Sequence, residues 1–121
     1  MTDEEKRVYM LLKAVIYHYH GLDEVEKKDL EETAIQLNAQ EALTWGLEFI
    51  AKDYLTSFDR ARIYLNEIIG DYSKDKRVEL INMVWQVNNL KGYVTEMEVT
   101  AMLKLAKDWS VEKELIELIL K

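Results

Sequence analysis

The chain has 121 residues, of which 49% are hydrophobic and 32% charged, the balance of an ordinary globular protein rather than a disordered one. It contains no proline and no cysteine, which favours helix and excludes disulfides, thiolate metal sites and cysteine nucleophiles. A formal net charge of −7 argues against nucleic-acid binding, which needs a concentrated basic surface.

Apolar residues recur at helical spacing along nearly the whole chain and predict an all-α bundle of about seven helices in a single domain, residues 1–121. The first helix runs from Asp3 to about His20 and is apolar on two sides, so we expect it to be central. Asp23 and Glu26 form a capping box that opens a second helix, which extends to about Asn38.

Asn38 is expected to cap a third helix, which contains Gly46. Glycine inside a helix costs roughly 1 kcal/mol relative to alanine, so Gly46 predicts the close approach of another helix backbone. Thr56 or Ser57 begins a fourth helix that ends at Gly70. The polar residues 71–75 are the best candidate for a turn in the middle of the chain.

The remaining sequence predicts three more helices. The fifth is apolar around more than half of its circumference, is expected to be central like the first, and ends at Gly92. Thr95 and Glu98 form a second capping box, which opens the sixth helix. Ser110 is expected to cap the seventh.

A shift of 72 residues aligns the two halves of the chain, 8–39 with 80–111. The capping-box glutamates Glu26 and Glu98 coincide under this shift, and so do the core positions Leu30 and Met102. The glycine, the capping box and the core periodicity follow in the same order in each half. We therefore expect two pseudo-symmetric halves.

The segment from Gly92 to Glu98, followed by Met102, Leu105, Ala106 and Trp109, resembles the tellurite-resistance TerB-like family. The signature of that family is Asp-Gly, a variable residue, an aliphatic residue, three variable residues and then Glu. The segment from Gly21 to Glu26 is a looser copy. The resemblance implies an all-helical fold with two pseudo-symmetric halves, covering nearly the whole chain, and a connection with stress response.

The resemblance also implies divalent-cation binding by the acidic groups of the two turns. The candidate metal ligands are Asp23, Glu24, Glu26, Glu96 and Glu98. Carboxylate oxygens suit Ca²⁺ or Mg²⁺, but acids at helix starts are more often caps that also complement the helix dipole. Lys91 and His20 occupy the position that is usually aspartate in the family, and Lys91 places a positive charge where the cation would lie.

Four aromatic or methionine residues lie off the main apolar stripes and are candidates for a partner-binding surface: Trp45, Phe49, Tyr17 and Met10. Trp45 and Phe49 are four residues apart and so share one helix face. If these side chains are exposed, they would mark a protein interface. If they are buried, they contact a further helix in the core.

Catalytic motifs are missing from the sequence, which has no glycine-rich phosphate loop, no nucleophile elbow and no paired-histidine zinc motif. The acidic N-terminus is unlike a secretory signal, and no apolar run reaches the ~20 residues that span a bilayer. We therefore expect a non-enzymatic, cytoplasmic binding or adaptor domain without membrane insertion or a cofactor. Its partner would be another protein or a second copy of itself, and a divalent-cation-binding module is the alternative.

Overall fold

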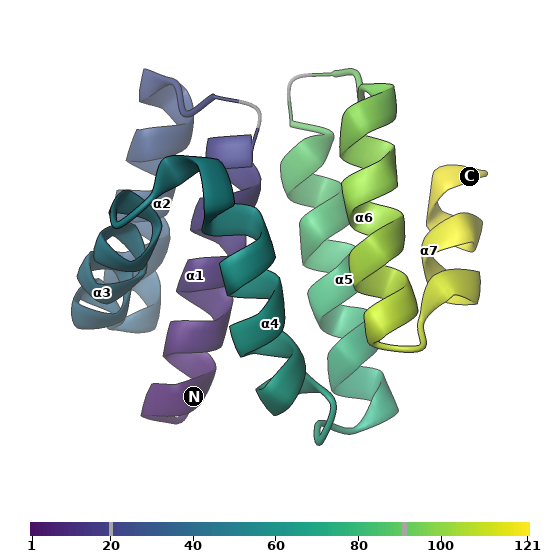
Figure 1. The fold of residues 1–121 in the computed structure, drawn as a ribbon, viewed down its shortest axis with the longest axis horizontal. Coiled ribbons are helices and arrows are strands. Elements are labelled where there is room, and N and C mark those ends of the chain that lie inside the picture. Colours follow the sequence, from purple (N-terminus) through teal and green to yellow (C-terminus); the bar gives the residue numbers. More distant parts are fainter. Residues whose placement is uncertain (20, 91) are drawn as a thin grey trace. The chain divides into compact units, whose positions relative to one another are not determined.

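The computed structural model describes residues 1–19, 21–90 and 92–121, and in these ranges the fold is all-helical, as predicted (Figure 1). Seven α-helices and one short 3₁₀ helix are present there, and no strand. The elements are α1 (Asp3–Tyr19), α2 (Glu24–Leu37), α3 (Gln40–Ala51), η1 (Tyr54–Thr56), α4 (Ser57–Ile69), α5 (Lys74–Asn88), α6 (Glu96–Asp108) and α7 (Glu112–Ile119). None of the helices in the described ranges combines the length and the apolar character required to cross a membrane.

The chain forms two compact units, Met1–Ala61 and Arg62–Lys121. The boundary between them falls inside α4, so the first turn of this helix belongs to the first unit and the remainder to the second. The polar stretch predicted as a mid-chain turn does separate two helices, because α4 ends at Ile69 and α5 begins at Lys74.

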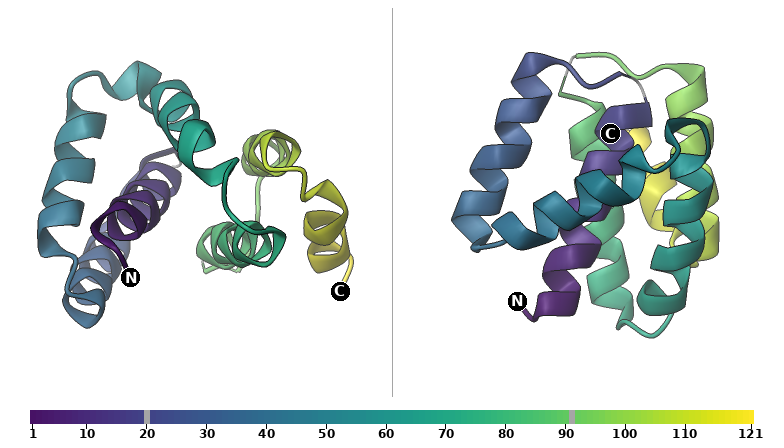
Figure 2. Two further views of the ribbon diagram at one scale, coloured as in Figure 1. Left: turned by 90° about the horizontal axis from the view of Figure 1, so that it is seen from below. Right: turned by 60° about the vertical axis from the view of Figure 1, so that its left-hand side comes forward.

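In the first unit α1 packs against both α2 and α3, and α3 lies across α1 (Figure 2). The crossing occurs at Gly46, where an added β-carbon would lie 3.4 Å from the Cα atom of Leu11. The close approach predicted from Gly46 is therefore confirmed. Residue 8 and residues 10–17 of α1 are all buried, which makes α1 the central helix of its unit.

In the second unit α5 and α6 lie side by side, and α7 packs against both of them (Figure 1). Five apolar residues of α5 are buried, while α7 buries Leu115. Core side chains of α6, among them Met102 and Leu105, are almost completely excluded from solvent. Burial of this apolar surface is the main source of stability in the unit.

Both predicted capping boxes are present. The Asp23 carboxylate accepts the Glu26 N–H at 2.8 Å and the Glu26 carboxylate accepts the Asp23 N–H at 3.1 Å. Thr95 and Glu98 form the same reciprocal pair at the start of α6. A third pair of this kind, which the sequence reading overlooked, joins Thr2 to Glu5 at the start of α1.

The capping roles predicted for Asn38 and Ser110 are wrong. Both residues adopt left-handed backbone conformations, with φ of 53° and 58°, and follow the ends of α2 and α6. A left-handed residue ends a helix, and asparagine tolerates this conformation well. The N-caps of α3 and α7 are instead Ala39 and Val111, neither of which makes a side-chain capping bond.

Candidate functional site

Trp45 and Phe49 form an aromatic pair on α3, as their spacing predicted. Their ring centroids are 5.7 Å apart and the ring planes are tilted by 47°. Both side chains are half-buried, so each presents part of its ring at the surface of the first unit. Tilted aromatic pairs at this separation attract each other beyond the burial of their area, which holds the two rings in place.

Two arginines flank this pair at its two ends. The guanidinium of Arg7 in α1 lies over the Trp45 ring at 5.3 Å, and that of Arg60 in α4 lies over the Phe49 ring at 5.1 Å. Both distances are within the range of cation–π attraction. The four side chains form a continuous row, which we call the aromatic ladder: Arg7, Trp45, Phe49 and Arg60.

Arg60 also closes the C-terminal end of α3. Its guanidinium donates hydrogen bonds to the carbonyl oxygens of Phe49 at 2.9 Å and of Asp53 at 2.8 Å, and its Nε donates to the Thr56 hydroxyl at 2.9 Å. Unpaired carbonyls at a helix end favour a cation there. Arg60 therefore has a structural role, whereas Arg7 is an exposed residue of the ladder.

Two hollows adjoin the ladder. The larger, of about 510 Å³, lies between the start of α1 and the start of α3 and is lined by Asp3, Lys6, Arg7 and residues 38–42. The smaller, of about 330 Å³, runs along α3 beside Trp45 and is lined by Gln40, Glu41, Thr44, Trp45 and Glu48. Gln40 and Glu41 line both hollows, so the two are neighbours on the surface of the first unit.

Met10 and Tyr17, the other two candidates for a partner-binding surface, are both 0% exposed. They belong to the core rather than to a surface that a partner could reach. The reason is their place on α1, whose second apolar stripe is buried like the first. Only Trp45 and Phe49 of the four candidates lie at the surface.

The Tyr17 hydroxyl belongs to a polar cluster inside the first unit. It donates a 2.6 Å hydrogen bond to Asp29 of α2, which also forms a 2.8 Å ion pair with Lys13 of α1. The Lys13 ammonium in turn donates to the Thr33 hydroxyl at 2.9 Å. This cluster fastens α2 to α1.

The ionisation of the cluster follows from its burial. Burial of the Asp29 carboxyl acts to raise its pKa, but the hydrogen bonds from Lys13 and Tyr17 outweigh this and lower the pKa. Burial, followed by the hydrogen bond to Asp29 and nearby negative charge, raises the pKa of Tyr17 far above its usual range. The cluster therefore holds a charged Lys13–Asp29 pair and a neutral tyrosine.

The five candidate metal ligands occupy the starts of two helices. The carboxylates of Asp23, Glu26 and Glu98 are bound in the capping boxes, and Glu24 and Glu96 are exposed in the first turns of α2 and α6. In the part of the chain that the structure describes, no three His, Asp or Glu side chains are placed to hold one ion. His20 and Lys91, which bear on the same prediction, lie outside the described residues.

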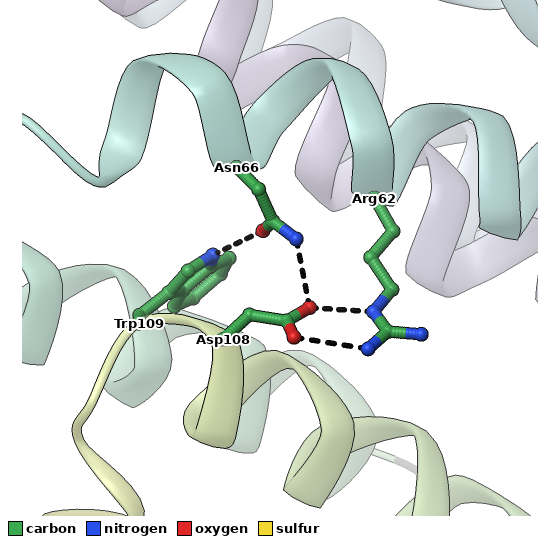
Figure 3. A network of polar contacts seen from close by, with 4 residues as sticks. All are labelled: Arg62, Asn66, Asp108 and Trp109. Atoms are coloured by element: carbon green, nitrogen blue, oxygen red, sulfur yellow. Dashed lines mark hydrogen bonds and ion pairs between the residues drawn. The ribbon is translucent and has the colours of Figure 1, made fainter.

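A second polar network lies within the second unit (Figure 3). Asp108, the last residue of α6, accepts two hydrogen bonds from the Arg62 guanidinium, one of them at 2.9 Å, and a third from the Asn66 amide at 2.8 Å. Asn66 accepts a 3.0 Å hydrogen bond from the indole N–H of Trp109. The network holds α4 to the end of α6.

The sequence reading missed both arginines of the ladder and both polar networks. The sequence around Arg7 does not indicate its contact with Trp45, because that contact joins two helices, α1 and α3. The polar cluster of Lys13 could have been predicted, because Lys13 interrupts an otherwise apolar run with a charge that needs a buried partner. No protein-family model, no curated protein and no solved structure matches this chain.

Proposed function

We propose that this chain is a non-enzymatic protein-binding domain and that the aromatic ladder with its two hollows is the surface that contacts the partner. The observation that supports the proposal most is the setting of Trp45. Its half-buried indole is fixed between Arg7 and Phe49 and lines a hollow along α3. Tryptophan and arginine are the residue types that most often dominate binding energy at protein interfaces.

The ladder is organised before any partner arrives. Trp45 has few rotatable bonds, and its contacts with Arg7 and Phe49 already restrict them. Binding then costs little side-chain entropy, which for a mobile side chain is about 0.5–1.5 kcal/mol. A pre-ordered tryptophan at the edge of a hollow is therefore well suited to anchor a segment of another protein.

As a finer assignment we propose a divergent TerB-like fold with two pseudo-symmetric halves. Two observations support it. Capping boxes begin α2 and α6 at positions 72 residues apart, and left-handed residues follow α2 and α6 at the same spacing, at Asn38 and Ser110. A cytoplasmic adaptor role in stress response is the functional setting that this family resemblance implies.

The experiment that tests the binding function is selection from a random peptide library displayed on phage. Wild-type protein should enrich peptides whose binding is lost in Trp45→Ala. Tyr54→Ala, which removes an exposed aromatic ring of the same unit outside the ladder, is the matched control and should retain binding. Circular dichroism verifies that both variants remain folded. Enrichment of no peptide, or equal binding by Trp45→Ala, would overturn the proposal.

Self-association is tested on the same proteins by analytical ultracentrifugation. A dimer of the wild-type chain that dissociates in Trp45→Ala would identify the partner as a second copy. A dimer that persists in Trp45→Ala would show that the chain self-associates through another surface. The partner of the aromatic ladder would then be a different protein.

A further inference from the structure

The smaller hollow has a definite chemical character, because its walls combine one aromatic ring with groups that accept hydrogen bonds. Glu41 and Glu48 lie on either side of Trp45 in the sequence of α3, at four residues before it and three after it. At 3.6 residues per turn the three side chains fall within about 60° of the helix circumference. The Cα atoms of Glu41 and Glu48 are therefore about 10 Å apart along the axis, with that of Trp45 between them.

Both carboxylates are available to a ligand. Glu41 and Glu48 are exposed, and neither side chain makes a hydrogen bond or an ion pair within residues 1–19, 21–90 and 92–121. The hydroxyl of Thr44, between them, donates to the Gln40 carbonyl of its own helix at 3.1 Å. The charged groups lining this hollow are thus both anionic, and a group rich in donors fits them best.

The neighbouring hollow differs in charge. It contains Lys6 and Arg7 together with Asp3, whereas no lysine or arginine lines the hollow beside Trp45. Arg7 already places a guanidinium over the indole, 5.3 Å from the ring centroid, within the range of cation–π attraction. A second cation that enters from the side of Glu41 would meet the same ring and two carboxylates.

We infer that the hollow of Gln40, Glu41, Thr44, Trp45 and Glu48 binds a cationic side chain, an arginine before a lysine, from a basic segment of the partner protein. This inference rests on the proposed function and names the partner's chemistry. The hollow runs along α3 and is open to solvent, so it suits one side chain of an extended segment rather than an enclosed ligand. Arginine is preferred because its planar guanidinium stacks on an aromatic face and can bond a carboxylate at the same time.

The net charge of −7 adds a long-range contribution. A negative protein attracts a basic segment from a distance and raises the association rate, an effect that salt screens. Binding of such a segment should weaken as ionic strength increases, because the Debye length falls from about 10 Å at 0.1 M to about 3 Å at 1 M.

The direct test uses small probes with the whole chain. N-acetylarginine amide is titrated against its neutral isostere N-acetylcitrulline amide, and the indole N–H signal of Trp45 is followed in a ¹H–¹⁵N spectrum. The signal is assigned by its loss in Trp45→Phe. The arginine probe should shift it saturably, and the citrulline probe should bind at least fivefold more weakly, since it lacks the charge. Equal shifts with the two probes would overturn the inference.

Variants locate the site. Glu41→Gln/Glu48→Gln should weaken binding of the arginine probe about fivefold, as expected for the loss of two exposed charge contacts. Glu24→Gln/Glu31→Gln alters the net charge by the same amount on α2 and should leave binding unchanged. A similar loss in both double variants would indicate non-specific attraction and overturn the inference.

The two proposals fail in different ways. Peptides that bind through Trp45 but carry no positive charge, and that are insensitive to Glu41→Gln/Glu48→Gln, would overturn the cationic pocket and leave the binding function intact. If no peptide depends on Trp45, the binding function fails. In that case a shift of the Trp45 signal by the arginine probe alone would show only a weak cation contact.

Discussion

Gly46 of α3 packs against the backbone of Leu11 in α1, so that a β-carbon on Gly46 would lie 3.4 Å from the Leu11 Cα atom. This distance admits a methyl group in van der Waals contact but nothing larger. We predict that Gly46→Ala changes the free energy of unfolding by less than about 1 kcal/mol, because the gain in helix propensity offsets the tighter contact. Gly46→Val should destabilise the protein by about 2–3 kcal/mol through overpacking. Urea denaturation measures both, and equal effects would contradict the close contact.

The Lys13–Asp29 pair provides a second prediction. Asp29→Ala leaves the Lys13 ammonium in the core without its counter-ion, with a side chain only 10% exposed. Because the Asp29 side chain is itself 36% exposed, the expected loss is reduced from the 3–5 kcal/mol of a fully buried pair to about 2 kcal/mol.

The double variant Lys13→Met/Asp29→Ala removes both charges and should be more stable than Asp29→Ala alone, since no unpaired charge remains. Urea unfolding of the four proteins in this double-mutant cycle gives the coupling free energy. A double variant less stable than Asp29→Ala would show that the unpaired Lys13 charge is not what destabilises that single variant.

The stability of the second unit should depend on pH through Asp108. Hydrogen bonds from Arg62 lower the pKa of this carboxyl below its ordinary value of 3.8. The folded state therefore binds the proton more weakly than the unfolded chain does. The resulting stability is fully present well above pH 3.8 and is lost as the pH falls through 3.8 towards the folded pKa.

Urea midpoints measured between pH 7 and pH 3 test this dependence. The wild type should lose more stability on acidification than Asp108→Asn, which cannot titrate at this position. Asp71→Asn, at an exposed aspartate in the turn between α4 and α5, is the control and should follow the wild type. If Asp108→Asn loses as much stability as the wild type, the Arg62 contact does not determine the acid sensitivity.

Loss of a capping box should destabilise the protein by the same amount with and without metal. Thr95→Ala removes the hydroxyl that accepts the Glu98 N–H and should cost about 1 kcal/mol, the usual value for a lost N-cap. The same loss should be found in millimolar Ca²⁺ and in a chelator. Thermal unfolding of wild type and variant under both conditions is the measurement. Stabilisation of the wild type alone by Ca²⁺ would instead favour the cation-binding alternative.

Local features were predictable from the sequence because neighbouring residues determine them. The spacing of Asp23 and Glu26 predicts a capping box, and the box is present. Asn38 was assigned to the wrong side of its turn, because asparagine is favoured both as an N-cap and as a left-handed helix-ending residue. The choice depends on the backbone conformation, which composition does not specify.

Apart from the close helix approach at Gly46, features that depend on tertiary contacts could not be predicted. The stripe of α1 that carries Met10 and Tyr17 looks like surplus apolar surface until the packing of the helix is known. The contact of Arg62 with Asp108 spans 46 residues, and no pattern near either residue indicates it. Of the four residues predicted for a partner-binding surface, only Trp45 and Phe49 lie at the surface, and the arginines beside them became visible only in the structure.

Helix α4 has a consequence for how the chain tolerates cleavage. A break between Ala61 and Arg62, where the two compact units meet in sequence, would leave residues 57–61 and 62–69 as helical stubs. Both stubs are shorter than the roughly 12 residues that an isolated helix needs. A break in residues 70–73 would leave every helix whole. Split or circularly permuted versions of this protein should therefore be opened at that turn rather than at the boundary between the units.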